Sequence, residues 1–334
     1  MQPETVIMLC ALCFVSAGKW HMFPFPPGLF HRLRSIEDYP RVARLPPVRR
    51  RFEAFLDEWR SRHEECGRQA IKPYMPLFRV VGGLDARPGS WPWMISLKQN
   101  KIGQIWCGAT LIARQWAVTA AHCFKGPFSD PETWTVQLGR YNTTPEAEEM
   151  TGVERRIGRL YKHPGYKGGF DFTDDIALIK LDQPVDFSDV ISPLCLPDAS
   201  VDADVEIKSG TECVVTGWGV LGTEGPLGSD VPHVLQQGLV PLISERDCRN
   251  FPGFARAITR GMMCAGYTEG GVDTCFGDSG GPLQCQVGHN WYLAGVTSHG
   301  INDTCADPEK PGIYTNILRY TDWIYWHMFL DPFF

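Results

Sequence analysis

Short runs of β-branched and aromatic residues alternate with clusters of Gly, Pro, Asn and Asp from Val80 onward. Runs of this length, bounded by turn-forming residues, are typical of strands in an all-β barrel or sandwich. Only the stretch 321–329 has the pattern of a helix, with Trp323, Ile324 and Met328 available to pack inward. The clearest strand candidates are the runs 116–119, 177–181, 213–216 and 291–296.

The first 17 residues have a different pattern. An apolar stretch runs from Val6 to Ala17 and ends in small residues, as the cleavage site of a signal peptide requires. The preceding residues carry Glu4 and no basic residue, so a short buried strand or helix is the alternative interpretation. No apolar run reaches the roughly 20 residues that cross a bilayer. We expect residues 1–17 to be a signal peptide, no membrane span, and a secreted, extracellular protein.

Residues 18–79 are rich in proline and do not resemble an independent domain. One amphipathic helix is expected over 48–63, with Phe52, Phe55 and Trp59 on one face. The basic run 49–51 is either a processing site or a solvated helix start. The segment carries 13 Lys and Arg against 7 Asp and Glu, whereas 80–334 carries 19 against 30. The basic segment either binds nucleic acid or heparin or is attracted to the acidic body; we favour the second and expect no nucleic acid.

The cysteine count supports export. Two of the twelve cysteines, Cys10 and Cys13, fall in the expected signal peptide, and ten remain. An even number in a secreted chain predicts five disulfides. No closely spaced cysteine pair follows Cys13, so neither a metal site nor another cofactor is expected.

Three segments carry the chemistry of peptide hydrolysis. His122 follows an apolar run and precedes Cys123, Asp175 directly precedes the apolar run 177–181, and Ser279 lies in the glycine-rich turn 277–282. A serine hydroxyl needs a base to take its proton, and the base needs a carboxylate to hold its tautomer. Glycine beside the serine lets backbone N–H groups converge where an oxyanion forms.

These segments, in the order His, Asp, Ser, resemble those of the chymotrypsin-like serine peptidases, and the resemblance runs from Val80 to about Phe329. It implies two antiparallel six-stranded β-barrels packed together with a C-terminal α-helix, preceded by a largely irregular pro-segment. It makes Ser279 the nucleophile, His122 the general base and Asp175 the orienting carboxylate, with the N–H groups of Gly277 and Ser279 as the oxyanion hole. The nearby Asp171 and Asp174 are interpreted as solvated loop acids.

The resemblance also implies a zymogen. The sequence around Arg79 and Val80 is similar to the family's activation junction. Cleavage there would free the Val80 amine to pair with the buried Asp278 carboxylate. The domains are then signal peptide 1–17, pro-segment 18–79 tethered by Cys66, and peptidase domain 80–334. The disulfides implied by the family are Cys107–Cys123, Cys213–Cys285, Cys248–Cys264, Cys275–Cys305 and, by the cysteines left over, Cys66–Cys195.

Asp273 matches the family position at the floor of the specificity pocket, and Ser298, Gly300 and Gly312 match residues that line it. A buried carboxylate there favours a cationic side chain, so the resemblance implies cleavage after Arg or Lys. His299 stands where an aromatic residue, usually Trp, is common, and Phe276 where many trypsins have a polar residue. These two departures leave the wider substrate preference open.

The expected function is a secreted serine endopeptidase that acts through an acyl-enzyme. Its expected partners are polypeptides with Arg or Lys before the cut bond, an activating trypsin-like protease or the enzyme itself, and protein protease inhibitors. One alternative is a non-catalytic homologue that acts as a binding protein; another is an enzyme with a narrow processing role. Asn142 and Asn302 lie in N-glycosylation motifs, so a glycoprotein is expected.

Overall fold

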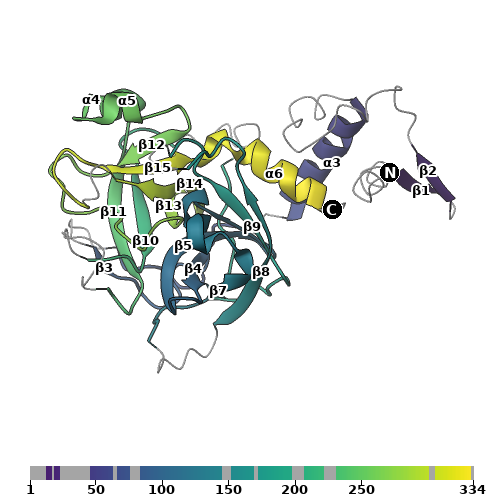
Figure 1. Ribbon diagram of the computed structural model, residues 1–334, viewed down its shortest axis with the longest axis horizontal. Helices are drawn as coiled ribbons and strands as arrows, with labels where there is room; N and C mark the ends of the chain where they lie inside the picture. Colours follow the sequence, from purple (N-terminus) through teal and green to yellow (C-terminus); the bar gives the residue numbers. More distant parts are fainter. Residues whose placement is uncertain are drawn as a thin grey trace. The chain divides into compact units, whose positions relative to one another are not determined.

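Two closed antiparallel barrels form the body of the molecule (Figure 1). The computed structural model describes residues 13–16, 19–22, 46–62, 66–75, 83–144, 152–168, 172–197, 207–221, 231–300 and 305–331. The first barrel has the strand order β4-β5-β6-β9-β8-β7. Its strands are β4 (Met94–Gln99), β5 (Gln104–Ala113), β6 (Trp116–Thr119), β7 (Trp134–Leu138), β8 (Val153–Lys162) and β9 (Ala177–Leu181).

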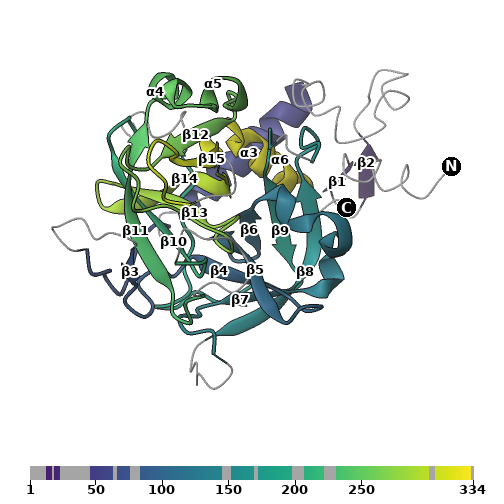
Figure 2. The same ribbon diagram turned by 60° about the vertical axis from the view of Figure 1, so that its left-hand side comes forward.

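The second barrel has the order β10-β13-β14-β15-β12-β11, is closed by β10 pairing with β11, and carries the short β3 (Leu84–Asp85) on β11. Figure 2 shows the two barrels side by side. The expected fold of two six-stranded barrels is confirmed. The strands are β10 (Glu212–Gly217), β11 (Gln236–Ile243), β12 (Met262–Ala265), β13 (Pro282–Val287), β14 (Asn290–His299) and β15 (Gly312–Asn316).

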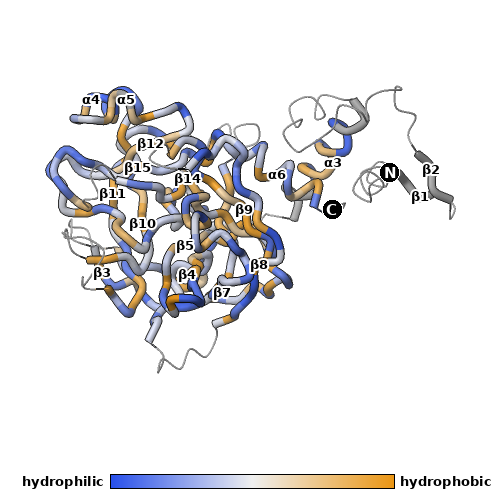
Figure 3. The backbone as a smooth tube through the Cα atoms, in the orientation of Figure 1, coloured by the Kyte–Doolittle hydropathy of each residue, from blue (hydrophilic) through white to orange (hydrophobic). Residues whose placement is uncertain are grey.

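Strand patterning follows burial. Hydrophobic and hydrophilic stretches alternate along the chain of both barrels (Figure 3). Strands such as β6 and β9 are buried over nearly their whole length, whereas β8 alternates between buried or half-buried and exposed positions over its first half. Continuous apolar runs suit strands whose two faces are both covered by protein, and alternation suits a strand with one face in water.

Short helices connect the strands. The 3₁₀ turn η2 (Ala121–Phe124) follows β6 and carries His122. Further single turns are η3 (Gly126–Phe128), η4 (Pro131–Thr133) and η5 (Ile317–Arg319), and α4 (Glu245–Asn250) and α5 (Phe254–Ala257) follow β11. The α4 helix begins where Ser244 Oγ accepts a hydrogen bond from the backbone N–H of Asp247 at 3.0 Å, an N-cap that the sequence encodes locally.

A second, smaller unit contains the helix α3 (Pro46–Arg62) and most of the C-terminal helix α6 (Thr321–Leu330). Both helices confirm the sequence-based predictions within two residues. Phe52 lies with its ring edge-on to Trp326 at 5.4 Å and to Phe329 at 5.5 Å between centroids, so the predicted apolar face of α3 packs on α6. The strands β1 (Cys13–Ser16) and β2 (Lys19–Met22) form an antiparallel hairpin. In the described part of the chain no helix is long and apolar enough to cross a bilayer.

All five disulfides join the cysteines that the family resemblance implied. The Cys66–Cys195 bond ties the segment 66–75 to the body, and hydrogen bonds continue the attachment. Gly67 N–H donates to Pro193 O at 2.8 Å, and Gln237 Nε2 donates to Tyr74 O at 2.7 Å. Residues on both sides of the predicted cleavage site therefore lie on the second barrel, because Gln237 also pairs with Leu84 in the sheet.

The barrels are joined by a buried polar contact. The Trp93 indole N–H donates to Gln284 Oε1, and Gln284 Nε2 donates to Thr216 Oγ1 at 3.3 Å. Trp93 precedes the first barrel, and Gln284 lies on β13 of the second. Both side chains are fully buried. Because a buried donor without an acceptor is costly, this contact fixes how the two barrels meet.

Gln284→Leu is expected to lower the free energy of unfolding by about 1–3 kcal/mol, because the buried Trp93 N–H loses its acceptor. Denaturant titration of the precursor carrying Ser279→Ala, which prevents self-digestion, measures the change. Gln286→Leu makes the same substitution at an exposed position two residues along β13 and is expected to change stability by about 0.5 kcal/mol or less. Equal losses in both variants would contradict the role of the Trp93 contact.

Candidate active site

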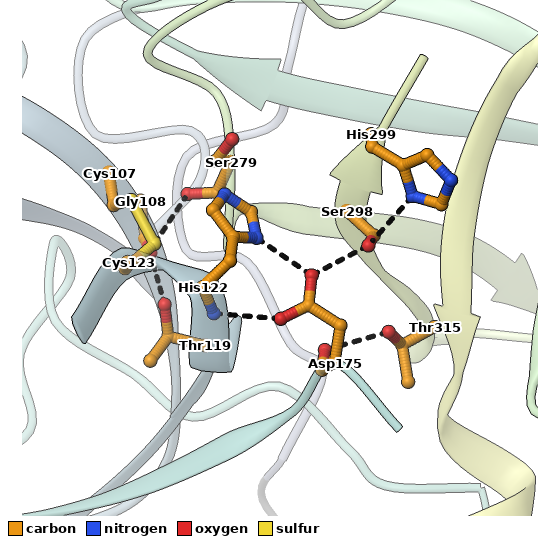
Figure 4. Close-up of polar contacts among 10 residues, drawn as sticks. All are labelled: Cys107, Gly108, Thr119, His122, Cys123, Asp175, Ser279, Ser298, His299 and Thr315. Carbon is orange, nitrogen blue, oxygen red and sulfur yellow. Dashed lines mark hydrogen bonds and ion pairs between the residues drawn. A yellow bond between two sulfur atoms is a disulfide. The ribbon is translucent and has the colours of Figure 1, made fainter. Parts of the chain in front are cut away.

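Asp175 is fully buried at the junction of the barrels, two residues before β9 begins. Its Oδ1 accepts a hydrogen bond from the backbone N–H of His122 at 2.8 Å, and its Oδ2 lies 2.7 Å from His122 Nδ1. The second barrel contributes Ser298 Oγ, 2.6 Å from Oδ2, and Thr315 Oγ1, which donates to the Asp175 carbonyl at 2.8 Å. Figure 4 shows the carboxylate between His122 and Ser298.

These contacts determine the charge of Asp175. Burial alone raises the pKa of a carboxyl group, but the charge of His122 and the hydrogen bonds from His122 and Ser298 hold the pKa of Asp175 below its ordinary value. The carboxylate is therefore ionised at neutral pH and fixes the proton of His122 on Nδ1. The other ring nitrogen, Nε2, is then the one that can accept a proton.

Ser279 lies in the turn between the buried Asp278 and β13. Its carbonyl oxygen accepts a hydrogen bond from Gly108 N–H at 2.7 Å and lies 3.9 Å from Cys123 Sγ, next to the residue that carries the imidazole. Gly277, two residues earlier, has φ of +101°, a conformation that an L-residue rarely adopts. Gly280, the residue after Ser279, has φ of +82°, and a Cβ there would lie 2.5 Å from Gly108 O. Glycine at position 280 thus allows the close backbone approach that brings the candidate nucleophile beside the first barrel.

Of the predicted pocket residues, the structure brings Asp273 and Gly312 together in the second barrel, whereas Ser298 and Gly300 do not line the cavity that contains Asp273. Asp273 Oδ1 accepts from Thr274 N–H at 2.7 Å and Oδ2 from Ala306 N–H at 3.3 Å. A Cβ on Gly312 would approach Asp273 Oδ1 to 2.5 Å, so this glycine leaves the space beside the carboxylate open. Asp273 and Asp278 line one cavity of about 270 Å³. Gly300 lies exposed just after β14, and Ser298 directs its hydroxyl to Asp175.

Burial raises the pKa of both carboxylates in this cavity. Burial and, to a smaller extent, the charge of Asp278 raise the pKa of Asp273 to about 7, against the hydrogen bonds from Ala306 and Thr274. Burial likewise raises the pKa of Asp278 to about 6, although Cys275 N–H and Gly219 N–H donate to it at 2.9 and 2.7 Å. Within the part of the chain that the structure describes, neither carboxylate forms an ion pair with a cationic side chain, so both are suited to receive a cation.

The interpretation of Asp174 as a solvated loop acid was wrong. Its side chain is half-buried, its Oδ1 accepts from Tyr320 O–H at 2.7 Å, and its Oδ2 lies 3.7 Å from His163 Nδ1. Its φ is +55°, so its backbone is in the left-handed region immediately before Asp175. Asp171, interpreted in the same way, lies outside the described residues, as do Arg79, Val80 and Asn302.

The structure also describes the predicted glycosylation position Asn142 and one cluster of possible metal ligands. Asn142 is half-buried, pairs with Val234 in a short bridge, and accepts from Thr144 N–H through Oδ1 at 2.9 Å. Cys107, His122 and Cys123 bring possible metal ligands within 4.8 Å of one another. Because both sulfur atoms belong to one disulfide, they are not free thiolates, and this cluster leaves His122 alone as a ligand.

The structure adds one residue that the sequence analysis missed. The Phe172 ring lies edge-on to His122 at 5.8 Å and stacks on His299 at 4.1 Å between centroids. Phe172 stands three residues before Asp175, and that proximity was the only signal in the sequence. The imidazole of the candidate base is therefore bordered by an aromatic pair drawn from both barrels.

Comparisons with known proteins agree with this geometry. Residues 80–324 match the family model described as Trypsin. Human testisin is 39% identical over 270 residues, which are 78% of this chain and 79% of testisin. Transmembrane proteases serine 11C and 11G of Mus musculus are each 40% identical over 78% of this chain. The chain covers 55% and 58% of those two proteins, a little over half of their length.

Asp278→Asn is expected to weaken the pH dependence of stability in the precursor carrying Ser279→Ala. The folded protein protonates Asp278 near pH 6, whereas the unfolded chain keeps the ordinary pKa near 3.8. The folded state therefore gains stability as pH falls from about 7 towards 4 and loses it as pH rises through 6. Removing the carboxyl group should reduce the difference in unfolding free energy between about pH 4.5 and about pH 7.5 by about 2 kcal/mol.

Asp186→Asn supplies the control, because that side chain is fully exposed. Asp273, with its pKa raised to about 7, acts in the same direction as Asp278, and His299, with its pKa lowered to about 4, acts in the opposite direction. Both remain in the variant and its parent, and the contribution of His299 cancels in the comparison. Asp273 loses the part of its raised pKa that Asp278 causes, which weakens the pH dependence in the same direction as the substitution itself. An unchanged pH dependence in Asp278→Asn would show that Asp278 does not hold the raised pKa.

Proposed function

Because this chain belongs to the trypsin family of serine endopeptidases, we propose that it is a secreted zymogen that hydrolyses peptide bonds after Arg or Lys. The observation that carries the proposed catalytic roles is the contact of His122 with Asp175 through both its backbone N–H and its Nδ1. Two hydrogen bonds from one residue to one buried carboxylate orient the ring and leave Nε2 to act as the base.

In the proposed reaction, Ser279 Oγ attacks the carbonyl carbon of the bond to be cut while His122 Nε2 takes the hydroxyl proton. The oxyanion of the tetrahedral intermediate accepts hydrogen bonds from the N–H groups of Gly277 and Ser279. His122 then gives its proton to the leaving amine as the C–N bond breaks, which leaves an ester on Ser279. Water, deprotonated by His122, attacks this ester and restores the free serine. Asp175 stays ionised and stabilises the imidazolium.

The proposed preference for Arg and Lys rests on Asp273. Its carboxylate lines the cavity with two backbone N–H donors, and its raised pKa indicates a charge that lacks a partner. A guanidinium or ammonium in the cavity would supply that partner and lower the pKa of Asp273. An apolar side chain would leave the buried charge unpaired, which costs several kcal/mol.

The proposed activation follows cleavage after Arg79. Gly83, three residues after Val80, lines the same cavity as Asp278. Three extended residues span roughly 10 Å, so the new amine of Val80 has the length of chain needed to enter this cavity. Gly217 and Gly219 support the proposal, because a Cβ on either residue would collide with the Asp278 carboxylate. Cleavage after arginine suits a protease of the same specificity, or the enzyme itself.

Secretion is supported by the expected signal peptide and by the five disulfides, which form and persist in oxidising compartments. The Cys66–Cys195 bond would keep the pro-segment attached after cleavage. The names of two relatives describe transmembrane proteases, and those names apply to those proteins.

The precursor is expected to be inactive until a trace of trypsin cuts after Arg79. An Arg ester should then be hydrolysed with a far higher kcat/KM than a Phe ester, whose slow hydrolysis remains measurable, and N-terminal sequencing should find a chain that begins at Val80. Ser279→Ala should be cut in the same way and stay inactive, whereas Arg79→Gln should stay uncut and inactive. Clean cutting without hydrolysis of either ester would instead favour the non-catalytic binding protein.

Asp273→Ser is expected to lower kcat/KM for the Arg ester by about 100- to 3,000-fold, because the substrate cation loses its buried partner. The Phe ester serves as the internal control, since hydrolysis of an uncharged substrate should not fall. Steady-state kinetics of the cut enzyme, with active sites counted by a serine-reactive phosphonate, measure both values. An equal loss on both esters would place the defect in the catalytic residues and argue against the specificity role.

A further inference from the structure

Ser298 and His299 approach each other in an unusual way for neighbours on a strand. Consecutive side chains of a strand point to opposite faces, yet Ser298 Oγ lies 3.1 Å from His299 Nδ1. The register of β14 against β15 shifts between Thr297 and His299, so Ser298 is the additional residue of a bulge. A bulge re-aims the side chains around it. It brings Ser298 towards Asp175 and leaves His299 behind the Ser298 hydroxyl (Figure 4).

The direction of these hydrogen bonds follows from the number of protons. An ionised carboxylate only accepts, so Ser298 donates its single hydroxyl proton to Asp175 Oδ2 at 2.6 Å. Ser298 Oγ can then only accept from His299. Burial lowers the pKa of His299 to about 4, so the ring is neutral at pH 7 and carries one N–H. The contact with Ser298 therefore requires that proton to be on Nδ1.

The His299 ring is held in place from its other side. It stacks on Phe172 with 14° between the ring planes, and Phe172 lies edge-on to His122. The charged groups that face this arrangement are Asp175 and His122, with Lys125 Nζ 5.8 Å from the Phe172 ring centre. Tyr166 is half-buried, and its hydroxyl is close enough to Asp175 to feel that charge. Burial, and then the charge of Asp175, raise the pKa of Tyr166 to about 12, so the hydroxyl is neutral.

We propose that His299 is a positioning residue for hydrolysis: its Nδ1–H donates to Ser298 Oγ and orients the hydroxyl that holds Asp175. This inference rests on the proposed roles of Ser279, His122 and Asp175. A hydroxyl that accepts one hydrogen bond becomes a stronger donor of the next. The N–H end of the His299 dipole also points towards the Asp175–His122 pair. Both effects lower the basicity that Asp175 confers on His122 and keep His122 unprotonated at a lower pH.

Two substitutions separate the hydrogen bond from the ring. His299→Phe keeps an aromatic ring to stack on Phe172 and removes the N–H. His299→Asn removes the ring and retains a side-chain nitrogen donor at the same bond distance from the backbone as Nδ1. The assay uses an Arg ester with no residue before the arginine, so contacts with an extended peptide do not contribute. Active sites are counted with a serine-reactive phosphonate, and unfolding midpoints monitor folding.

His299→Phe is expected to lower kcat by about 2- to 10-fold, the equivalent of one neutral hydrogen bond, with little change in KM. The midpoint of the acid limb of kcat/KM is expected to rise by roughly 0.2–0.5 pH unit, again within the effect of one such bond. His299→Asn should stay close to the parent in both. His289→Asn, the same change on an exposed turn, is the control and should alter neither.

The Ser298→Ala background provides the decisive comparison, because a residue that acts through Ser298 has no further effect once that hydroxyl is gone. An equal loss from His299→Phe with and without Ser298 would overturn the proposal. So would a loss in His299→Asn as large as that in His299→Phe, since the ring would then matter and the N–H would not. If the parent enzyme neither reacts with the phosphonate nor hydrolyses the ester, the proposed function fails instead.

Discussion

A carboxylate removed from water needs hydrogen-bond donors around it, and Asp175 finds them in both barrels. His122 supplies two from the first barrel, and Ser298 supplies one from the second. Thr315 of the second barrel adds a bond to the Asp175 carbonyl. An unpaired buried charge would cost several kcal/mol, so these donors favour the packing of the two barrels against each other. The same contacts orient the His122 imidazole.

Asp273 and Asp278 differ from Asp175 in that their pKa values are raised. Asp273 and Asp278 share a cavity, and backbone N–H groups only partly offset the cost of their burial, so their pKa values rise to about 7 and about 6. Asp175 thus accepts hydrogen bonds at both carboxylate oxygens within the folded chain, whereas burial still raises the pKa of Asp273 and Asp278 despite their backbone donors. On the proposed function, Asp278 receives its cation from the Val80 amine and Asp273 receives its cation from the substrate.

Much of the fold and of the candidate site could be predicted from the sequence because short, local sequence patterns determine them. The short apolar runs predicted an all-β barrel or sandwich, and the family resemblance carried by the motifs around His122, Asp175 and Ser279 implied the two barrels and marked the candidate site. The 3.6-residue period predicted α3 and α6. The stack of His299 on Phe172 could not be predicted, because it depends on a bulge that changes strand register by one residue. Asp174 was misjudged for a similar reason: its partner, Tyr320, lies 146 residues away.

The position of His299 shows why these non-local contacts matter for the chemistry. The His299 ring lies against Phe172, which borders His122, and its Nδ1 also reaches Ser298. A larger apolar ring there could stack without adding a hydrogen bond. In this chain the ring is half-buried, neutral and hydrogen-bonded, so it adds a polar contact to Ser298, which in turn donates to Asp175, without adding a competing charge. Histidine at position 299 thus changes the surroundings of Asp175 while leaving its direct donors unchanged.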